Sequence, residues 1–87
     1  MYVIMTYDVG QERISKVLGI GRKYLIWIQN SVFEGEITDA NFMRLKYELS
    51  KVIDEKHDSI TFFILRTTAY MRKETLGITK GENTTII

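Results

Sequence analysis

The chain of 87 residues contains no cysteine, a single histidine and no long apolar run. The lack of cysteine excludes disulfides, thiolate zinc sites and thiol nucleophiles, and it is compatible with a reducing compartment. One histidine, His57, cannot form a multi-histidine metal site within one subunit. No segment approaches the roughly 18 apolar residues of a membrane span, and the N-terminus lacks the basic start and apolar core of a secretory signal. We therefore expect a cytoplasmic protein with no membrane partner.

An excess of charge of one sign is also lacking, since the net charge is +1 and too near zero to indicate nucleic-acid binding by itself. Its distribution is uneven: residues 34–58 carry seven acidic and four basic side chains, whereas residues 1–33 carry four basic and two acidic ones. The basic residues of the first third follow directly on the carboxylate of Asp8, so a polyanion drawn to them would lie near it. We predict these four as nucleic-acid-binding residues: Arg13, Lys16, Arg22 and Lys23.

The first part of the chain predicts a strand followed by a helix. Residues 1–7 are rich in Val, Ile, Tyr and Thr and apolar on both sides, which is typical of a central strand. From Gln11 the apolar residues take a helical spacing, which directs Arg13, Lys16 and Lys23 toward solvent. Asp8 or the Val9-Gly10 turn would begin this helix, and Gly19 with Gly21 would end it. The apolar stripe comprises Ile14, Val17, Leu18 and Gly21.

The next segments predict a hairpin and a second helix. Residues 24–37 are strand-like but long, and we divide them at Gln29-Asn30 into arms over 24–28 and 31–36; one long bent strand is the alternative. Thr38 and Asp39 supply a helix N-cap. The helix continues to about Glu55 on an apolar face formed by Phe42, Leu45, Leu49, Val52 and Ile53.

The last third predicts mostly strand. Residues 59–66 form a strand, residues 70–79 a weaker one, and residues 81–83 a turn before the tail at 84–87. The order predicts an α+β fold of the ferredoxin-like βαββαβ type, with an antiparallel sheet, two helices on one face and a C-terminal edge strand. We expect one domain over residues 1–87, with its core in 1–79 and a partner-pairing turn and strand in 80–87. The uncovered sheet face is expected to bind a second copy or another protein.

Asp8 has two interpretations. It is either an N-cap for the following helix, which the residues by themselves favour, or an acid for metal chemistry at the end of the first strand. One aspartate is a poor Mg²⁺ site, because Mg²⁺ takes one or two carboxylates together with waters and substrate phosphates. A dimer that placed two copies of Asp8 together would meet that requirement.

Three stretches read together resemble a known family. Tyr7-Asp8 closes the first strand, Gln29-Asn30-Ser31-Val32-Phe33-Glu34-Gly35-Glu36 follows the first helix, and Ile53-Asp54 with Asp58-Ser59-Ile60 leads into a later strand. They resemble the second CRISPR-associated protein, the small subunit of the spacer-acquisition machinery, from Met1 to about Leu65. Residues 66–87 carry no motif of this resemblance.

The resemblance implies a homodimer whose paired Asp8 carboxylates bind Mg²⁺ or Mn²⁺, with Tyr7, Ser31 and Phe33 as site surroundings. It also implies metal-dependent endonuclease activity on RNA or DNA and a scaffold role that holds DNA for an integrase partner. Because the sequence offers no obvious general base, we expect turnover to be slow or absent. In the metal-assisted reaction, Arg13 and its basic neighbours would position the phosphodiester backbone. Two alternatives stay open: a toxin-type endoribonuclease of the same dimeric fold, and a non-catalytic dimeric interaction module.

Overall fold

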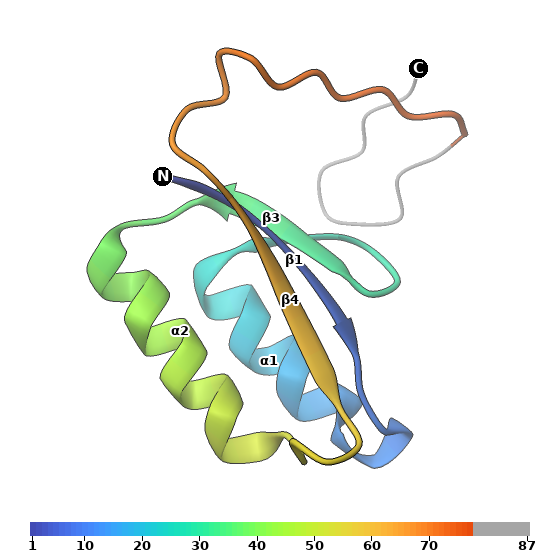
Figure 1. Cartoon of the computed structure of the whole chain (residues 1–87). Helices are drawn as coiled ribbons and strands as arrows, with labels where there is room; N and C mark the ends of the chain where they lie inside the picture. Colours follow the sequence, from blue (N-terminus) through green and yellow to red (C-terminus); the bar gives the residue numbers. More distant parts are fainter. Residues whose placement is uncertain (78–87) are drawn as a thin grey trace.

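The computed structural model describes residues 1–77, and within them a four-stranded antiparallel sheet is covered on one face by two helices (Figure 1). The strands are β1 (Tyr2–Asp8), β2 (Ile26–Gln29), β3 (Val32–Glu36) and β4 (Ser59–Leu65). A short 3₁₀ turn, Gln11–Arg13, leads into α1 (Ile14–Tyr24), and α2 (Asp39–Val52) joins β3 to β4. The sheet order is β2-β3-β1-β4, so β1 is central as predicted. This confirms the ferredoxin-like βαββαβ fold.

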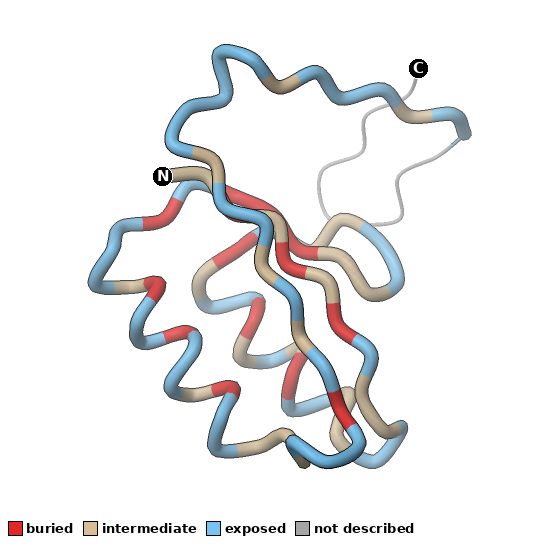
Figure 2. Tube along the Cα trace, viewed as in Figure 1, coloured by how far each residue is buried: buried red, intermediate tan, exposed pale blue. Residues whose placement is uncertain are grey.

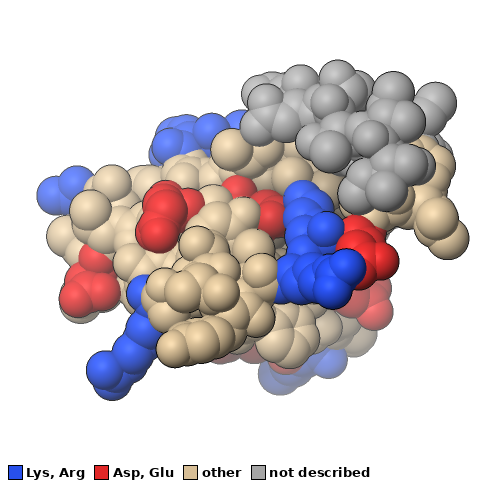
Figure 3. Space-filling model, turned by 90° about the horizontal axis from the view of Figure 1, so that it is seen from above, with Lys and Arg blue, Asp and Glu red and all other residues tan. Residues whose placement is uncertain are grey.

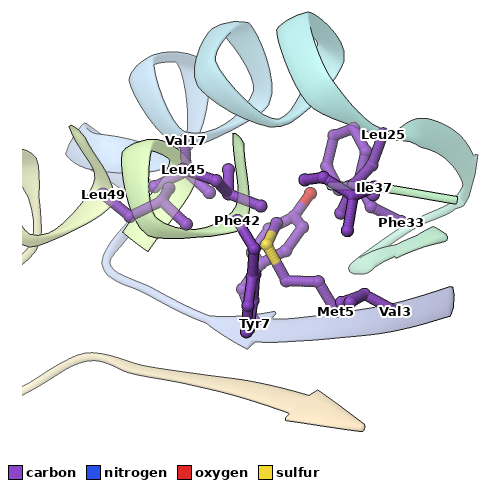
Figure 4. Packing of buried hydrophobic residues seen from close by; sticks show 10 residues of the cluster. All are labelled: Val3, Met5, Tyr7, Val17, Leu25, Phe33, Ile37, Phe42, Leu45 and Leu49. Carbon is purple, nitrogen blue, oxygen red and sulfur yellow. The ribbon is translucent and has the colours of Figure 1, made fainter. Parts of the chain in front are cut away.

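The core lies between the helices and the sheet (Figures 2 and 4). Alternation along β1 places every second side chain on the helix side, where Val3 and Met5 are fully buried. Phe33 of β3 and Leu45 of α2 are also fully buried, and the ring of Phe42 meets Phe62 of β4 edge to face at 5.1 Å between centroids. The predicted apolar faces of both helices therefore form this core.

The hairpin and the start of the second helix follow the predictions. β2 and β3 pair as a hairpin whose turn includes Asn30 at a positive φ of 37°, so the long bent strand is excluded. The side chain of Thr38 accepts a hydrogen bond from the Asn41 amide at 3.1 Å, which is the predicted N-cap. The predicted end at Glu55 is wrong, because α2 ends at Val52 and Ile53 already has an extended backbone.

Neither Gly19 nor Gly21 ends the first helix, which continues to Tyr24 and takes that residue from the predicted strand. The reason lies in packing: Gly21 is buried, and a Cβ there would lie 2.7 Å from the ring of Phe33. Glycine at this position lets the helix approach the sheet closely. Gly19 has nothing within 4 Å of its would-be Cβ, so no contact requires glycine there.

The face opposite the helices is partly covered by the chain itself. Residues 70–77 form no strand, which corrects the predicted strand over 70–79; its last residues and the 80–87 tail lie outside the described part. Lys73 from this segment pairs with Glu34 of β3 at 2.9 Å, and the hydroxyl of Tyr2 donates to the same carboxylate at 2.6 Å. Residues 70–77 are thus held against the sheet by side-chain contacts instead of by strand pairing. Glu34 is 7% exposed despite its charge. In residues 1–77 no helix is long and apolar enough to cross a membrane.

The two glycines of α1 give opposite predictions. Gly19→Ala should raise the free energy of unfolding by about 0.5–1 kcal/mol, because alanine restricts the unfolded chain and fits the open helix surface. Gly21→Ala should lower it by about 1–2 kcal/mol, because the methyl group overlaps a buried ring and the overpacking outweighs the helix gain. Urea unfolding followed by circular dichroism measures both; changes of the same sign would contradict the proposed packing of Gly21.

Candidate functional site

The candidate site lies at one end of the sheet, where β1 ends and β4 begins. Asp8 is the last residue of β1 and stands opposite Ser59 in the β1–β4 register. The loop after β1 and the loop before β4 meet beside this pair and line a surface pocket. Its lining residues are Asp8, Val9, Gly10, Glu12, Arg13, Asp54, His57 and Asp58.

The two loops are joined by the carboxylate of Asp58, whose side chain is fully buried. Its Oδ2 accepts from Arg13 Nε at 2.5 Å and from the Asp54 amide at 2.8 Å. Its Oδ1 accepts from Arg13 Nη2 and from the Gly10 amide, both at 2.8 Å. The guanidinium of Arg13 and these backbone donors hold the pKa of Asp58 well below its ordinary value. We call this arrangement the Asp58 clasp: Asp58 with its donors Gly10, Arg13 and Asp54.

The backbone conformation of Gly10, with a φ of −58°, is open to any residue. The reason for glycine at this position is therefore the space around it. A Cβ at this position would lie 2.5 Å from Arg13 Nη2 and 2.1 Å from Glu12 Oε1. The guanidinium thus occupies the volume that a side chain would need. The predicted solvent orientation of Arg13 is wrong for the same reason, because its side chain is 23% exposed and bound to Asp58.

Asp8 does not cap a helix. No side-chain cap hydrogen bond is present at the 3₁₀ turn or at α1, whose N-cap residues are Gly10 and Arg13. The cap interpretation is therefore wrong. Asp8 itself is exposed, whereas the other acidic residues of the pocket are engaged: Asp54 with His57 at 2.9 Å, Glu12 with Arg13 at 3.3 Å, and Asp58 in the clasp. Within residues 1–77, Asp8 is the pocket carboxylate without a hydrogen-bond or ion-pair partner.

Of the predicted site surroundings, Tyr7 and Phe33 lie in the core on the helix side of the sheet, and Ser31 lies in the turn between β2 and β3. The Tyr7 hydroxyl donates to the Asn30 carbonyl at 2.8 Å, and burial raises its pKa. The Tyr7 amide donates to the Ser31 carbonyl at 3.1 Å, and the Phe33 ring lies 6.1 Å from the Tyr7 ring between centroids. The structure brings Tyr7, Ser31 and Phe33 together as support for the end of β1, and none of them lines the pocket.

The four predicted nucleic-acid-binding residues are spread along α1. Arg13 is held in the clasp, and Lys16 is exposed one turn into the helix. Arg22 lies over the Trp27 ring at 5.4 Å, and Lys23 pairs with Glu48 of α2. Lys23 also lines a second pocket beside Met1, at the other end of β1. Basic and acidic side chains are interspersed on the face seen in Figure 3.

A divalent metal ion fits Asp8 as half of a site. Among the described residues, no group of three or more His, Cys, Asp or Glu side chains is arranged to hold a metal ion. Asp8 nevertheless offers two unengaged, hard oxygen ligands on the surface, which is the donor type that Mg²⁺ and Mn²⁺ take. The remaining ligands would have to come from a second copy, from waters and from a phosphate.

The fold and the site define a small ferredoxin-like protein whose central strand ends in an exposed, partnerless carboxylate. The chain belongs to the CRISPR-associated protein Cas2 family, whose family model matches residues 1–73. This confirms the family resemblance and extends it beyond Leu65.

Curated relatives and solved structures agree. The chain is 56% identical over 87 residues to "CRISPR-associated endoribonuclease Cas2" of Dictyoglomus turgidum, covering 100% of both chains. It is 51% identical over 83 residues to the protein of the same name from Thermotoga maritima, covering 95% of each. The crystal structure of Streptococcus pyogenes Cas2 at pH 6.5 superposes with a TM-score of 0.78 at 42% identity, covering 88% of this chain and 100% of that one.

Sequence reasoning missed the role of Asp58. The residue stood in one of the stretches that carry the family resemblance, but its partners Arg13 and Gly10 are 45 and 48 positions away in the chain. The one available signal was an acidic residue directly before a predicted apolar strand, where an unpaired charge is costly if the side chain is buried.

The depressed pKa of Asp58 predicts a pH-dependent stability. Its pKa in the folded state lies below the ordinary 3.8, so its contribution to stability is complete above about pH 4 and is lost as the pH falls through the folded value. The melting temperature of Asp58→Asn should therefore lie below that of the wild type at pH 7, and the gap should narrow below pH 4. Scanning calorimetry from pH 7 to pH 2 measures this, with Asp39→Asn as the control. A gap independent of pH would contradict the prediction.

Proposed function

We propose that this protein is a homodimeric, divalent-metal-dependent endoribonuclease of the CRISPR adaptation machinery, in which Asp8 from each of two copies binds Mg²⁺ or Mn²⁺. The observation that carries the proposal is the state of Asp8: in a pocket whose other carboxylates are engaged, it is exposed and has no partner within residues 1–77. Its curated relatives bear the name endoribonuclease, which supports RNA as the substrate.

The reaction would be phosphodiester hydrolysis, in which a water oxygen bonds to phosphorus as the bond to the leaving ribose oxygen breaks and that oxygen takes a proton. A bound divalent ion supplies a lowered water pKa and neutralises phosphate charge. The two Asp8 carboxylates would hold it, and the exposed Lys16 would contact the RNA backbone without reading sequence. Arg13 would act through the clasp, because its guanidinium is already bound to Asp58.

The far face of the sheet supports the homodimer. Phe63 of β4 and Ile26 of β2 face away from the helices, as their registers opposite Ile4 and Glu34 require, and they are 54% and 39% exposed. The segment 71–74 borders Ile4 and Glu34 and leaves this apolar area open. A second copy on this face would bury it and bring two strand ends toward each other.

A scaffold role beside an integrase subunit, with DNA as the bound nucleic acid, is the second candidate. Within residues 1–77, the pocket offers a single partnerless carboxylate, Asp8, and no complete metal-binding group, and both observations favour the scaffold role. The toxin-type alternative is less well supported, since the family is CRISPR-associated. Absence of metal-dependent cleavage by the wild-type dimer would favour the scaffold over the nuclease.

The Asp8→Asn variant tests the metal site. It keeps the shape of the side chain and removes the charge. We therefore expect Mn²⁺ affinity, measured by electron paramagnetic resonance, and Mn²⁺-dependent RNA cleavage each to fall by about 100-fold or more. Loss of a residue that only orients a metal ligand has a smaller effect, about 10- to 100-fold. The control is Asp39→Asn, which makes the same change on exposed α2 and should retain both. Unchanged cleavage in Asp8→Asn would refute the site.

The Phe63→Asp variant tests the dimer. A charge on the apolar face should convert the protein to a monomer in light scattering and reduce Mn²⁺-dependent cleavage together with Mn²⁺ binding, because each monomer holds half a site. Tyr47→Asp places a charge on the exposed surface of α2, 62% exposed in the wild type, and should stay dimeric. A monomeric wild type, or a dimeric Phe63→Asp, would count against this interface.

A further inference from the structure

The Asp58 clasp fixes the backbone on which Asp8 sits. Asp8 is followed by Val9 and then by Gly10, whose amide donates to Asp58 at 2.8 Å. On the other side, Asp8 is opposite Ser59, the residue next to Asp58. The short segment that carries the Asp8 carboxylate is therefore held at both ends, by strand pairing and by the clasp.

Asp58 is unsuited to bind a metal ion itself. An ionised carboxylate has about four acceptor positions, and here Arg13, Gly10 and Asp54 supply four donors to its two oxygens. Its charge is compensated by the guanidinium of Arg13, and its side chain is fully buried. The clasp is thus a neutral, saturated structure, and a cation in this pocket would meet the free charge of Asp8.

We propose that Asp58 is a positioning residue for Asp8, acting through Gly10 and Arg13 to hold the strand end in the orientation that binds the divalent ion. This inference rests on the proposed function of Asp8 as a metal ligand. Arg13 belongs to the same clasp, so it would contribute to cleavage by orienting Asp8 and not by contacting RNA. Gly10 contributes its amide and the space for the guanidinium.

Two variants that break the clasp differently test the proposal. Asp58→Asn keeps the shape and removes the charge that binds Arg13. Gly10→Ala changes no charge and displaces the Arg13 guanidinium together with the Glu12 carboxylate paired to it, because its methyl group would lie 2.5 Å from Arg13 Nη2 and 2.1 Å from Glu12 Oε1. Both should weaken Mn²⁺ binding, measured by electron paramagnetic resonance, by about 10-fold, the usual effect of losing a residue that orients a ligand. Cleavage should recover when Mn²⁺ is raised in proportion, so the defect appears in the metal requirement and not in kcat.

The control separates positioning from general destabilisation. Leu45→Ala removes a fully buried core side chain that does not line the pocket, so it lowers the melting temperature without touching the clasp. All proteins are measured at a temperature below their melting transitions, and Leu45→Ala should bind Mn²⁺ within twofold of the wild type. If Asp58→Asn does not fold, Gly10→Ala decides alone.

The outcomes distinguish this inference from the proposed function. Mn²⁺ affinity that is lost in Asp8→Asn but unchanged in both clasp variants overturns the positioning role and leaves the metal site standing. Mn²⁺ affinity that is unchanged in Asp8→Asn overturns both. Equal losses in Leu45→Ala and the clasp variants also overturn the positioning role, because stability alone would then explain the effect.

Discussion

A buried carboxylate is stable only when its charge is compensated and its oxygens are hydrogen-bonded, and the functional end of this sheet is built around one such group. Asp58 meets both conditions by binding Arg13 from the start of the first helix, Gly10 from the loop after β1 and Asp54 from its own loop. These three segments converge because they supply its donors. The end of β1, the start of α1 and the entry into β4 are therefore fixed relative to one another by a single side chain.

The sheet face opposite the helices also contains a nearly buried carboxylate, that of Glu34. Tyr2 and Lys73 compensate it. Burial and the hydrogen bond to this carboxylate raise the pKa of Tyr2 above its ordinary value. Lys73 holds the segment after β4 against Glu34, and Phe63 and Ile26 stay exposed on the same face of the sheet. The surface available to a second copy is thus defined partly by a charge pair.

The sequence predicted those elements whose local signals agree with the tertiary structure. The Thr38 cap, the turn at Asn30 and the apolar faces of the helices depend on short-range patterns, and each was found. The errors have tertiary causes: Gly21 continues a helix because the Phe33 ring needs the space, and residues near Lys73 leave strand geometry where they contact Glu34. The same distinction applies to the site. Asp8 could be recognised at the end of a predicted strand, whereas the contacts of Asp58 with Arg13 and Gly10 join residues 45 and 48 positions apart.

The unpaired carboxylate of Asp8 would couple dimerisation to metal binding. An exposed carboxylate costs little in one copy, because water solvates it. In the proposed dimer two such groups approach each other, and like charges at close range oppose association unless one takes a proton or a cation lies between them. A divalent ion that binds both carboxylates would offset this repulsion, so it would strengthen association, and association would in turn strengthen its binding. The Asp58 clasp adds no net charge to this balance, because Arg13 neutralises it. Within the described pocket, the carboxylate left to respond to the ion is the one on the strand end.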